Sequence, residues 1–340
     1  METRRIMKLG RSSLVVSLPK RWVELNHLKQ GDAVTIATQR DGSLAIFPGV
    51  IKRDRKKEIT IKVDADENPD FIVRKIVSSY LNGCSDIYLA SSGVLSVSQQ
   101  KAIREISGKL FLQIMEADSK RMHIQSLLDE SRVSVENGIR RMYVLTSSMC
   151  QDVLKALETW DVKLAKSVYV LDDNVDQFFF MLLRLLRMAM LDLSLANRMG
   201  LEPLNCLDYE AVVRKIEHIG DHVANIAARI ILIDGAGRRF DQETTNAMLK
   251  VGAEAHRAYE KAFIAFVSKD AELANQAIEL RTHIAKLCDR MAEKIKEQKD
   301  NIIVCGTCSV RDSIMRIAEF AAGIAEIAMD CAITPKPQNK

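Results

Sequence analysis

Proline and aromatic residues are scarce in this chain of 340 residues. It contains six prolines, and aromatic side chains make up 5% of its residues. Hydrophobic residues account for 47% and charged residues for 28%, a globular composition that excludes disorder, collagen-like repeats and a disulfide-stapled miniprotein. At roughly 100 to 200 residues per domain, the length predicts two or three domains with separate cores.

Long uninterrupted hydrophobic runs are also missing. The longest apolar stretch covers residues 178–191 and contains Arg184 and Arg187, so it falls short of the roughly 18 apolar residues that mark a membrane span. The basic N-terminus has no apolar core of a signal peptide, which predicts a cytoplasmic protein. Seven scattered cysteines fit reduced thiols in that compartment better than a disulfide framework.

Basic charge is concentrated at one end of the chain. Residues 1–60 hold 13 Lys and Arg against 6 Asp and Glu, or +7, whereas the other 280 residues hold 36 against 39, or −3. This asymmetry favours a polyanion-binding head on a nearly neutral body. The alternative is an ordinary solvated basic surface.

The first fifty residues have the pattern of a small β unit. Four short apolar segments alternate with turn signals at Gly10, at Gly31 with Asp32, and at Asp41 with Gly42. The segments cover residues 2–9, 13–18, 33–38 and 43–48. Pro19 can begin a short helix, because its missing N–H would be unpaired in a first helical turn. Strands this short bury too little surface to be stable alone, so we expect residues 1–50 to dimerise.

Residues 58–129 predict a compact α/β domain. Alternating apolar and polar residues indicate strands, and Pro69 opens the first of two helical patterns. Strands are predicted over 59–64, 86–90, 111–116 and 121–128, and helices over 69–83 and 96–110. The order is β-α-β-α-β-β, and no motif in it assigns a function.

From residue 130 onwards the apolar pattern becomes helical. Heptad-like spacing predicts long amphipathic helices over 135–160 and 164–185, and a third helix runs from about 207 to 233 after a break at Gly200. The predicted fold class is multidomain α+β, with a small β head, an α/β domain and an all-α body.

The helical region repeats itself. Residues 161–176 align without gaps on residues 270–285, an offset of 109. A period of this length indicates two copies of a whole three-helix unit, which we place at 130–240 and 241–334.

The opening segment resembles the SpoVT/AbrB family of DNA-binding domains. The resemblance lies in GRSSLVVSLPKRW, followed by LKQGDAVTI and DGSLAIFP. It implies that two chains interleave their hairpins into one swapped β-barrel with basic residues facing double-stranded DNA. By position, those residues are Arg4, Arg5, Lys8, Arg11, Lys20 and Arg21. Clustered Arg and Lys bind DNA by displacing counterions from phosphates. The alternative is that this unit only dimerises the protein.

Acidic residues recur every four positions in two predicted helices. Glu217, Asp221 and Asn225 lie on one face of the third helix, and Asp172 and Asp176 have the same spacing in the second. Carboxylates that converge from facing helices form metal sites, and oxygen ligands favour hard cations. We therefore predict a divalent or ferric ion here, with iron, zinc, manganese and magnesium as candidates. The alternative is a solvated acidic stripe.

The segment RKIEHIGDHVANIAARI at 214–230 resembles the PhoU family of phosphate-homeostasis regulators. The resemblance covers about residues 130–334. Together with the N-terminal match, it makes the chain similar to the archaeal type of phosphate uptake regulator, which joins both domains. It implies two three-helix bundles, an iron or zinc cluster, and phosphate transport or signalling proteins as partners. The second repeat departs from the pattern, because its matching positions are Arg281, Ala285, Met315, Glu319 and Gly323. We therefore expect metal in the first bundle only.

Two smaller pairs of possible ligands are weak signals. His218 and His222 are four residues apart but lack a clear third ligand. Cys305 and Cys308 form one C-x-x-C that we place in an interhelical loop, and a zinc site would need two more ligands.

No phosphate-cradling loop and no catalytic triad is present in the sequence, so we expect a regulator and not an enzyme. The resemblances predict a DNA-binding homodimer that regulates phosphate uptake. One alternative is a transition-state or antitoxin-type regulator whose helical body is an oligomerisation scaffold. Another is a metal-dependent phosphatase.

Overall fold

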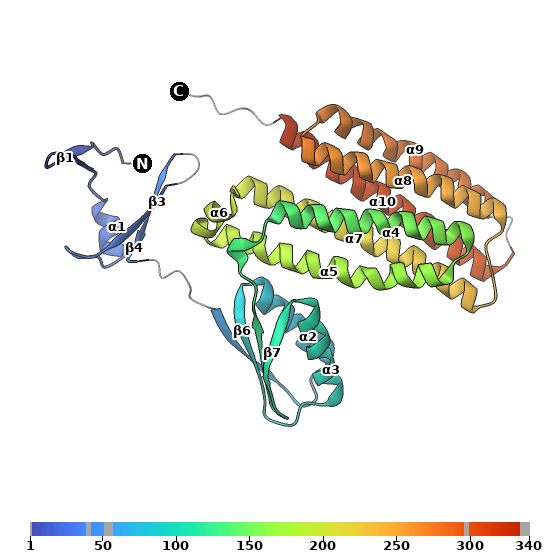
Figure 1. Ribbon diagram of the computed structural model, residues 1–340, viewed down its shortest axis with the longest axis horizontal. Helices are drawn as coiled ribbons and strands as arrows, with labels where there is room; N and C mark the ends of the chain where they lie inside the picture. The colour runs from blue at the N-terminus through green and yellow to red at the C-terminus, as the bar shows by residue number, and fades with distance from the viewer. Residues whose placement is uncertain (1, 39–41, 51–56, 296–298, 334–340) are drawn as a thin grey trace. The chain divides into compact units, whose positions relative to one another are not determined.

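The computed structural model describes residues 2–38, 42–50, 57–295 and 299–333. The chain divides into two compact units, one formed by residues up to Lys56 and the other from Lys57 onwards. Figure 1 shows the β-rich first unit, and the α/β domain and helices of the second.

The N-terminal unit consists of two hairpins and one short helix. Strand β1 (Met7–Leu9) pairs with β2 (Ser13–Val15), and β3 (Val34–Thr38) pairs with β4 (Leu44–Pro48), both antiparallel. Helix α1 (Lys20–Leu25) lies between the hairpins in sequence. The four predicted strands and the helix are confirmed, although the first two strands are shorter than predicted and Pro19 is the N-cap and not a first-turn residue. The predicted turn at residues 41–42 is described only from Gly42.

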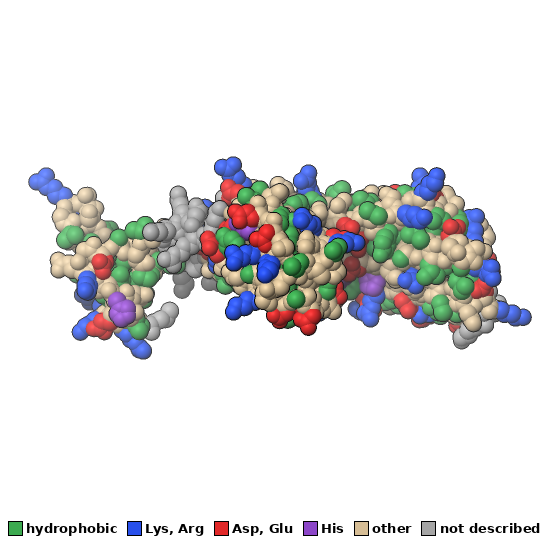
Figure 2. Space-filling view, turned by 90° about the horizontal axis from the view of Figure 1, so that it is seen from below, with side chains coloured by type: hydrophobic (Ala, Val, Ile, Leu, Met, Phe, Trp, Pro, Cys, Tyr) green, Lys and Arg blue, Asp and Glu red, His purple; other side chains and the backbone are tan. Residues whose placement is uncertain are grey.

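No described side chain between residues 2 and 50 is buried. Large apolar residues are exposed instead, including Leu14 at 71%, Ile36 at 58% and Leu44 at 60%. Figure 2 shows hydrophobic side chains open on the surface of this unit. The described residues of the N-terminal unit therefore form no hydrophobic core within one chain.

The second unit begins with the α/β domain. Its elements are β5 (Lys57–Val63), α2 (Pro69–Leu81), β6 (Cys84–Ser91), α3 (Val97–Lys109), β7 (Leu112–Ala117) and β8 (Arg121–Ser126). The sheet has the order β5-β6-β8-β7, with β5 parallel to β6 and the other pairs antiparallel. Asn68 and Ser96 cap the two helices with their side chains, and Ser96 forms a capping box with Gln99. The predicted β-α-β-α-β-β order is confirmed.

A short 3₁₀ turn leads from the sheet to the helical body. The turn is η1 (Glu130–Arg132), and the helices are α4 (Val135–Thr159), α5 (Val162–Leu191), α6 (Leu193–Met199), α7 (Pro203–Gly235), α8 (Gln242–Ser268), α9 (Ala271–Ile295) and α10 (Asn301–Ile333). Helices α4, α5 and α7 pack together, as do α8, α9 and α10, and contacts of α7 with α10 and of α4 with α8 join the two sets. One continuous hydrophobic core runs through both bundles. No helix in the described part of the chain is long and apolar enough to span a membrane.

Three details of the helical body differ from the sequence prediction. Helix α7 begins at Pro203, four residues before the predicted start, and the short helix α6 was not predicted. Asp192 starts α6 by accepting hydrogen bonds from two backbone amides at its N-terminus. Cys305 and Cys308 lie inside α10 and not in a loop.

The internal repeat is visible at equivalent turns. Trp160 and Lys269 end α4 and α8 in the left-handed conformation, with φ of 56° and 54°. The carboxylates of Asp161 and Asp270 then accept backbone hydrogen bonds at the starts of α5 and α9. Because the same turn chemistry recurs in the same place, α4 and α5 correspond to α8 and α9.

Candidate functional site

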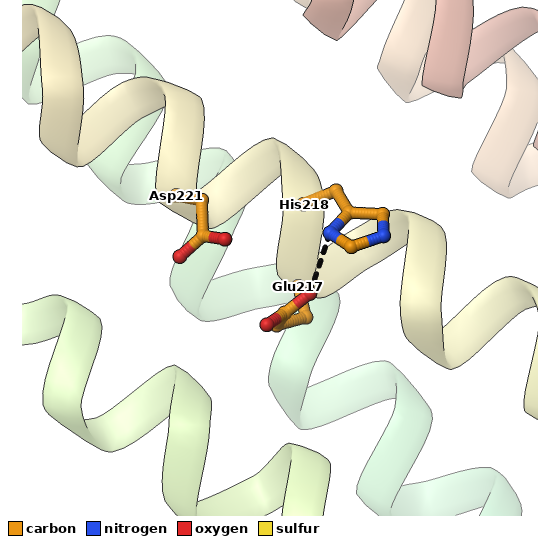
Figure 3. Close-up of side chains that lie close together, drawn as sticks. All are labelled: Glu217, His218 and Asp221. Carbon is orange, nitrogen blue, oxygen red and sulfur yellow. Dashed lines mark ion pairs between the residues drawn. The ribbon is translucent and has the colours of Figure 1, made fainter. Parts of the chain in front are cut away.

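The acidic residues come together between α5 and α7. These two helices pack side by side, and a Cβ atom at Gly220 of α7 would lie only 3.3 Å from Oδ1 of Asp172 on α5. Glycine at this position therefore allows the close approach of the helices. Figure 3 shows Glu217 and Asp221 pointing to the same side of α7. We call Asp172, Asp176, Glu217 and Asp221 the acid cluster.

Burial and neighbouring negative charges raise the pKa values of Asp172, Glu217 and Asp221. Burial, followed by the charges of Asp221 and Asp176, raises the pKa of Asp172 to about 7. Burial and the charges of the neighbouring acids raise the pKa of Glu217 to about 8, and burial and Asp176 raise that of Asp221. Asp221 is exposed and the other three carboxylates are partly buried. A cation or protons would stabilise carboxylates this close to each other.

His218 adds a nitrogen atom to the acid cluster. One ligand atom each from Glu217, His218 and Asp221 lies within 4.8 Å of the others. Oε2 of Glu217 is buried and accepts no hydrogen bond from the described residues, although Nδ1 of His218 lies 2.8 Å from it. A buried oxygen without a donor, beside two further ligand atoms, fits a metal ion.

Asn225 faces a different neighbour. Its amide nitrogen donates hydrogen bonds to the hydroxyl oxygens of Ser309 and Ser313 on α10, at 3.2 and 2.8 Å. The structure therefore brings together four of the five residues that the sequence assigned to the metal and directs the fifth towards the second bundle.

The second bundle has only one acid at the matching positions, and it is already paired. Glu319 lies 2.8 Å from Arg316 in an ion pair on α10. His222 packs against Phe320, with 5.8 Å between ring centroids, and burial, followed by Arg316, lowers its pKa. Both imidazole rings thus pack against Phe320 of α10, and His218 also contacts Glu217.

Lys109, at the end of α3, reaches α5 beside the acid cluster. Its Nζ lies 2.6 Å from Oδ1 of Asp173 and 3.2 Å from Oδ2 of Asp176. Sequence reasoning missed this residue, because nothing in the spacing of a lysine in the α/β domain relates it to a helix more than sixty residues later. Its only local signal is a basic residue in a last helical turn, which is common.

The six basic residues predicted to face DNA are all exposed on the N-terminal unit. Lys8 lies on β1, Arg11 in the turn between β1 and β2, and Lys20 and Arg21 at the start of α1. Arg4 pairs with Glu2 and lies 3.4 Å from the hydroxyl of Ser17. Except for the Arg4 pair and a 3.8 Å contact between Lys20 and Glu24, the described residues show no ion pair for these side chains.

Two different family models match two different parts of the chain. Residues 139–230 match the family model of the PhoU domain. This part of the chain is similar to a PhoU domain. Residues 7–58 match the model described as "Antidote-toxin recognition MazE, bacterial antitoxin", which confirms an AbrB-type N-terminal unit. The PhoU domain match includes α5 and most of α7, and hence the acid cluster.

A solved structure supports the helical fold. PhoU from Pseudomonas aeruginosa is 20% identical, with a TM-score of 0.51 over 57% of this chain and 93% of that chain. PhoU from Streptococcus pneumoniae is 17% identical, with a TM-score of 0.47 over 57% and 91% of the two chains. No curated protein sequence matches the chain. The first likeness extends the helical PhoU fold beyond the residues that match the family model.

Proposed function

We propose that the protein is a DNA-binding regulator of phosphate uptake and cellular phosphate homeostasis. The observation that carries this proposal is the union in one chain of a MazE-type N-terminal unit and a PhoU domain. The N-terminal unit supplies exposed basic residues for the phosphates of double-stranded DNA. The helical body senses the phosphate state of the cell, or it contacts phosphate transport and signalling proteins.

The proposal is tested by the phosphate dependence of DNA binding. Mobility shifts of the full chain on a pool of genomic fragments should identify bound DNA, and the bound fragments should include phosphate-transport promoters. Inorganic phosphate, or a phosphate transport protein added to the mixture, should change the affinity for these fragments. Removal of residues 1–56 should abolish binding.

The MazE match also favours the alternative of an antitoxin-type regulator. In that case the helical body is an oligomerisation scaffold, and DNA affinity is the same with and without phosphate or transport proteins. Binding to promoters unrelated to phosphate, unaffected by either addition, would support this alternative.

We propose that the N-terminal units of two chains form a dimer. The exposed apolar side chains, including Leu14, would supply the missing core, and paired chains would cover strand edges. The full chain should sediment at twice its mass of 38.2 kDa. Leu14→Glu should shift it towards the monomer, because a carboxylate in the dimer core is costly.

Val97→Glu is the matched control for this prediction. Val97 is 84% exposed at the start of α3, outside the N-terminal unit, so its replacement should leave the dimer intact. A wild-type protein that is monomeric at micromolar concentration would contradict the proposed dimer. A dimer unaffected by Leu14→Glu would show that it does not form through the N-terminal units.

We propose that the acid cluster, with His218, binds a divalent or ferric metal ion in the first bundle only. Carboxylate and imidazole ligands suit iron and zinc, and manganese or magnesium remain candidates for the oxygen ligands. When bound, the ion would supply positive charge between α5 and α7. Asp172 and Asp176 would hold it from one helix, and Glu217, His218 and Asp221 from the other.

Without metal, thermal stability should fall as the pH rises from about 5 to about 8. The folded pKa values of Asp172 and Glu217 lie near 7 and 8, above the unfolded values of about 4. Raised carboxyl pKa values stabilise the fold below the unfolded pKa, and this stability is lost as pH passes the folded pKa. Excess Mn²⁺ should restore the melting temperature at pH 8, where the ligands are ionised.

Asp221→Ala should make this pH dependence shallower and remove the response to Mn²⁺, because it deletes both a repelling charge and a ligand. Asp312→Ala is the matched control, since Asp312 is an exposed acid of α10 paired with Arg311. Melting temperatures and elemental analysis of the purified proteins provide the measurements. The same Mn²⁺ response in wild type and Asp221→Ala, or no response in wild type, would reject the site.

A further inference from the structure

Helix α3 of the α/β domain ends against the acid cluster. The ammonium group of Lys109 lies between Asp173 and Asp176 of α5, and Asp176 is a member of the cluster. The side-chain amide of Gln177 also lies 3.5 Å from the carbonyl oxygen of Gly108. The contact thus joins the last turn of α3 to the α5 segment that carries half of the cluster.

A second, separate contact holds the α/β domain on the same helix. Arg184 is fully buried and donates hydrogen bonds to the carbonyl oxygens of Tyr80, near the end of α2, and of Cys84, at the start of β6. By contrast, the side chains of Lys109 and Asp173 are 36% and 61% exposed. The exposed contact can therefore open in water while the buried one persists.

Lys109 already supplies one positive charge to the acid cluster. A metal ion bound by Asp176 and its neighbours would bring two or three further positive charges to the same carboxylates. Like charges held by the same carboxylates repel each other, although water screens this repulsion at the partly exposed ammonium group. The ammonium group and the metal ion therefore disfavour each other on these acids.

We propose that Lys109 is the resident counter-ion of the acid cluster and competes with the metal ion, so that metal binding releases the end of α3 from α5. This inference rests on the proposed metal site, and it adds the α/β domain as the element that responds to metal. The coupling is reciprocal: whatever holds α3 on α5 weakens metal binding by the same factor.

Calorimetric titration of the full-length, metal-free protein with Mn²⁺ tests the competition. Lys109→Met should bind Mn²⁺ about tenfold more tightly than wild type, since about 1.4 kcal/mol of repulsion is removed. Lys109→Arg keeps the charge and should bind as wild type does. Lys101→Met is the matched control, because Lys101 lies on α3 but pairs with Glu105, away from the cluster.

Hydrogen exchange on the same proteins tests the release. Mn²⁺ should speed amide exchange in the last turn of α3, at 106–110, and leave the end of α2 beside Arg184 unchanged. Lys109→Met should show the faster exchange before Mn²⁺ is added.

The outcomes separate this inference from the metal site itself. Equal Mn²⁺ affinity in wild type and Lys109→Met, with unchanged exchange in α3, would overturn the role of Lys109 and leave the metal site standing. No Mn²⁺ binding by either protein would overturn both. Binding by Lys109→Met alone would support the competition.

Discussion

Replacement of Arg184 by methionine should lower the free energy of unfolding by about 3 to 5 kcal/mol, the range for breaking a buried ion pair. The guanidinium group is 0% exposed, and its Nε and Nη2 atoms lie 3.1 and 2.9 Å from Oε1 of Glu130. It also donates to the carbonyl oxygens of Tyr80 and Cys84 and lies 4.7 Å from the centroid of the Tyr80 ring. Methionine fills similar space but leaves these acceptors without donors.

Arg187→Met is the matched control for this prediction. Arg187 lies one turn further along α5 and also donates to the end of α2, at the carbonyl of Leu81 and the side chain of Asn82, but it is exposed. Its loss should change the free energy by less than about 1 kcal/mol. Denaturant unfolding followed by circular dichroism measures both variants. Equal effects would show that burial of Arg184 is not what stabilises the junction.

DNA affinity should fall about a thousandfold between 50 and 200 mM salt. If three basic side chains per chain contact phosphates in a dimer, six contacts give a slope of about −5 in log affinity against log salt. Arg11→Ala and Arg21→Ala should each weaken binding and reduce the slope by about 2, one contact from each chain. Fluorescence anisotropy with a labelled duplex, titrated at several salt concentrations, measures the slope.

Lys29→Ala is a suitable control, because Lys29 is an exposed cation of the N-terminal unit outside the predicted set. It should bind with the affinity and slope of wild type. A dimer that binds no DNA at low salt would contradict the prediction, as would a slope that is unchanged by Arg11→Ala and Arg21→Ala.

Features with local causes could be predicted from the sequence. The helices that begin after Asn68, Ser96 and Asp161 have side-chain caps, and a cap depends only on the next two or three residues. The repeat was recognisable for the same reason, since both copies place an aspartate, Asp161 or Asp270, at the start of the next helix.

Features that depend on a distant partner could not be predicted. Arg184 was recognisable only as a break in an apolar run, because its backbone acceptors are about a hundred residues away in sequence.

Asn225 illustrates a limit of spacing arguments. Asn225 lies eight residues after Glu217. At 3.6 residues per turn, eight residues rotate the chain by two full turns and about 80° more around the helix axis. The third member of a four-residue series therefore turns away from α5, and Asn225 meets α10.

The exposed apolar side chains of the N-terminal unit would make the proposed DNA binding depend on protein abundance. If this unit acquires a core only by pairing with a second copy, its folding becomes a second-order process and its stability rises with chain concentration. Below the dissociation constant of the dimer, the number of DNA-competent heads would grow with the square of the number of chains. A twofold change in expression would then change the supply of competent heads about fourfold, before any ligand acts on the helical body.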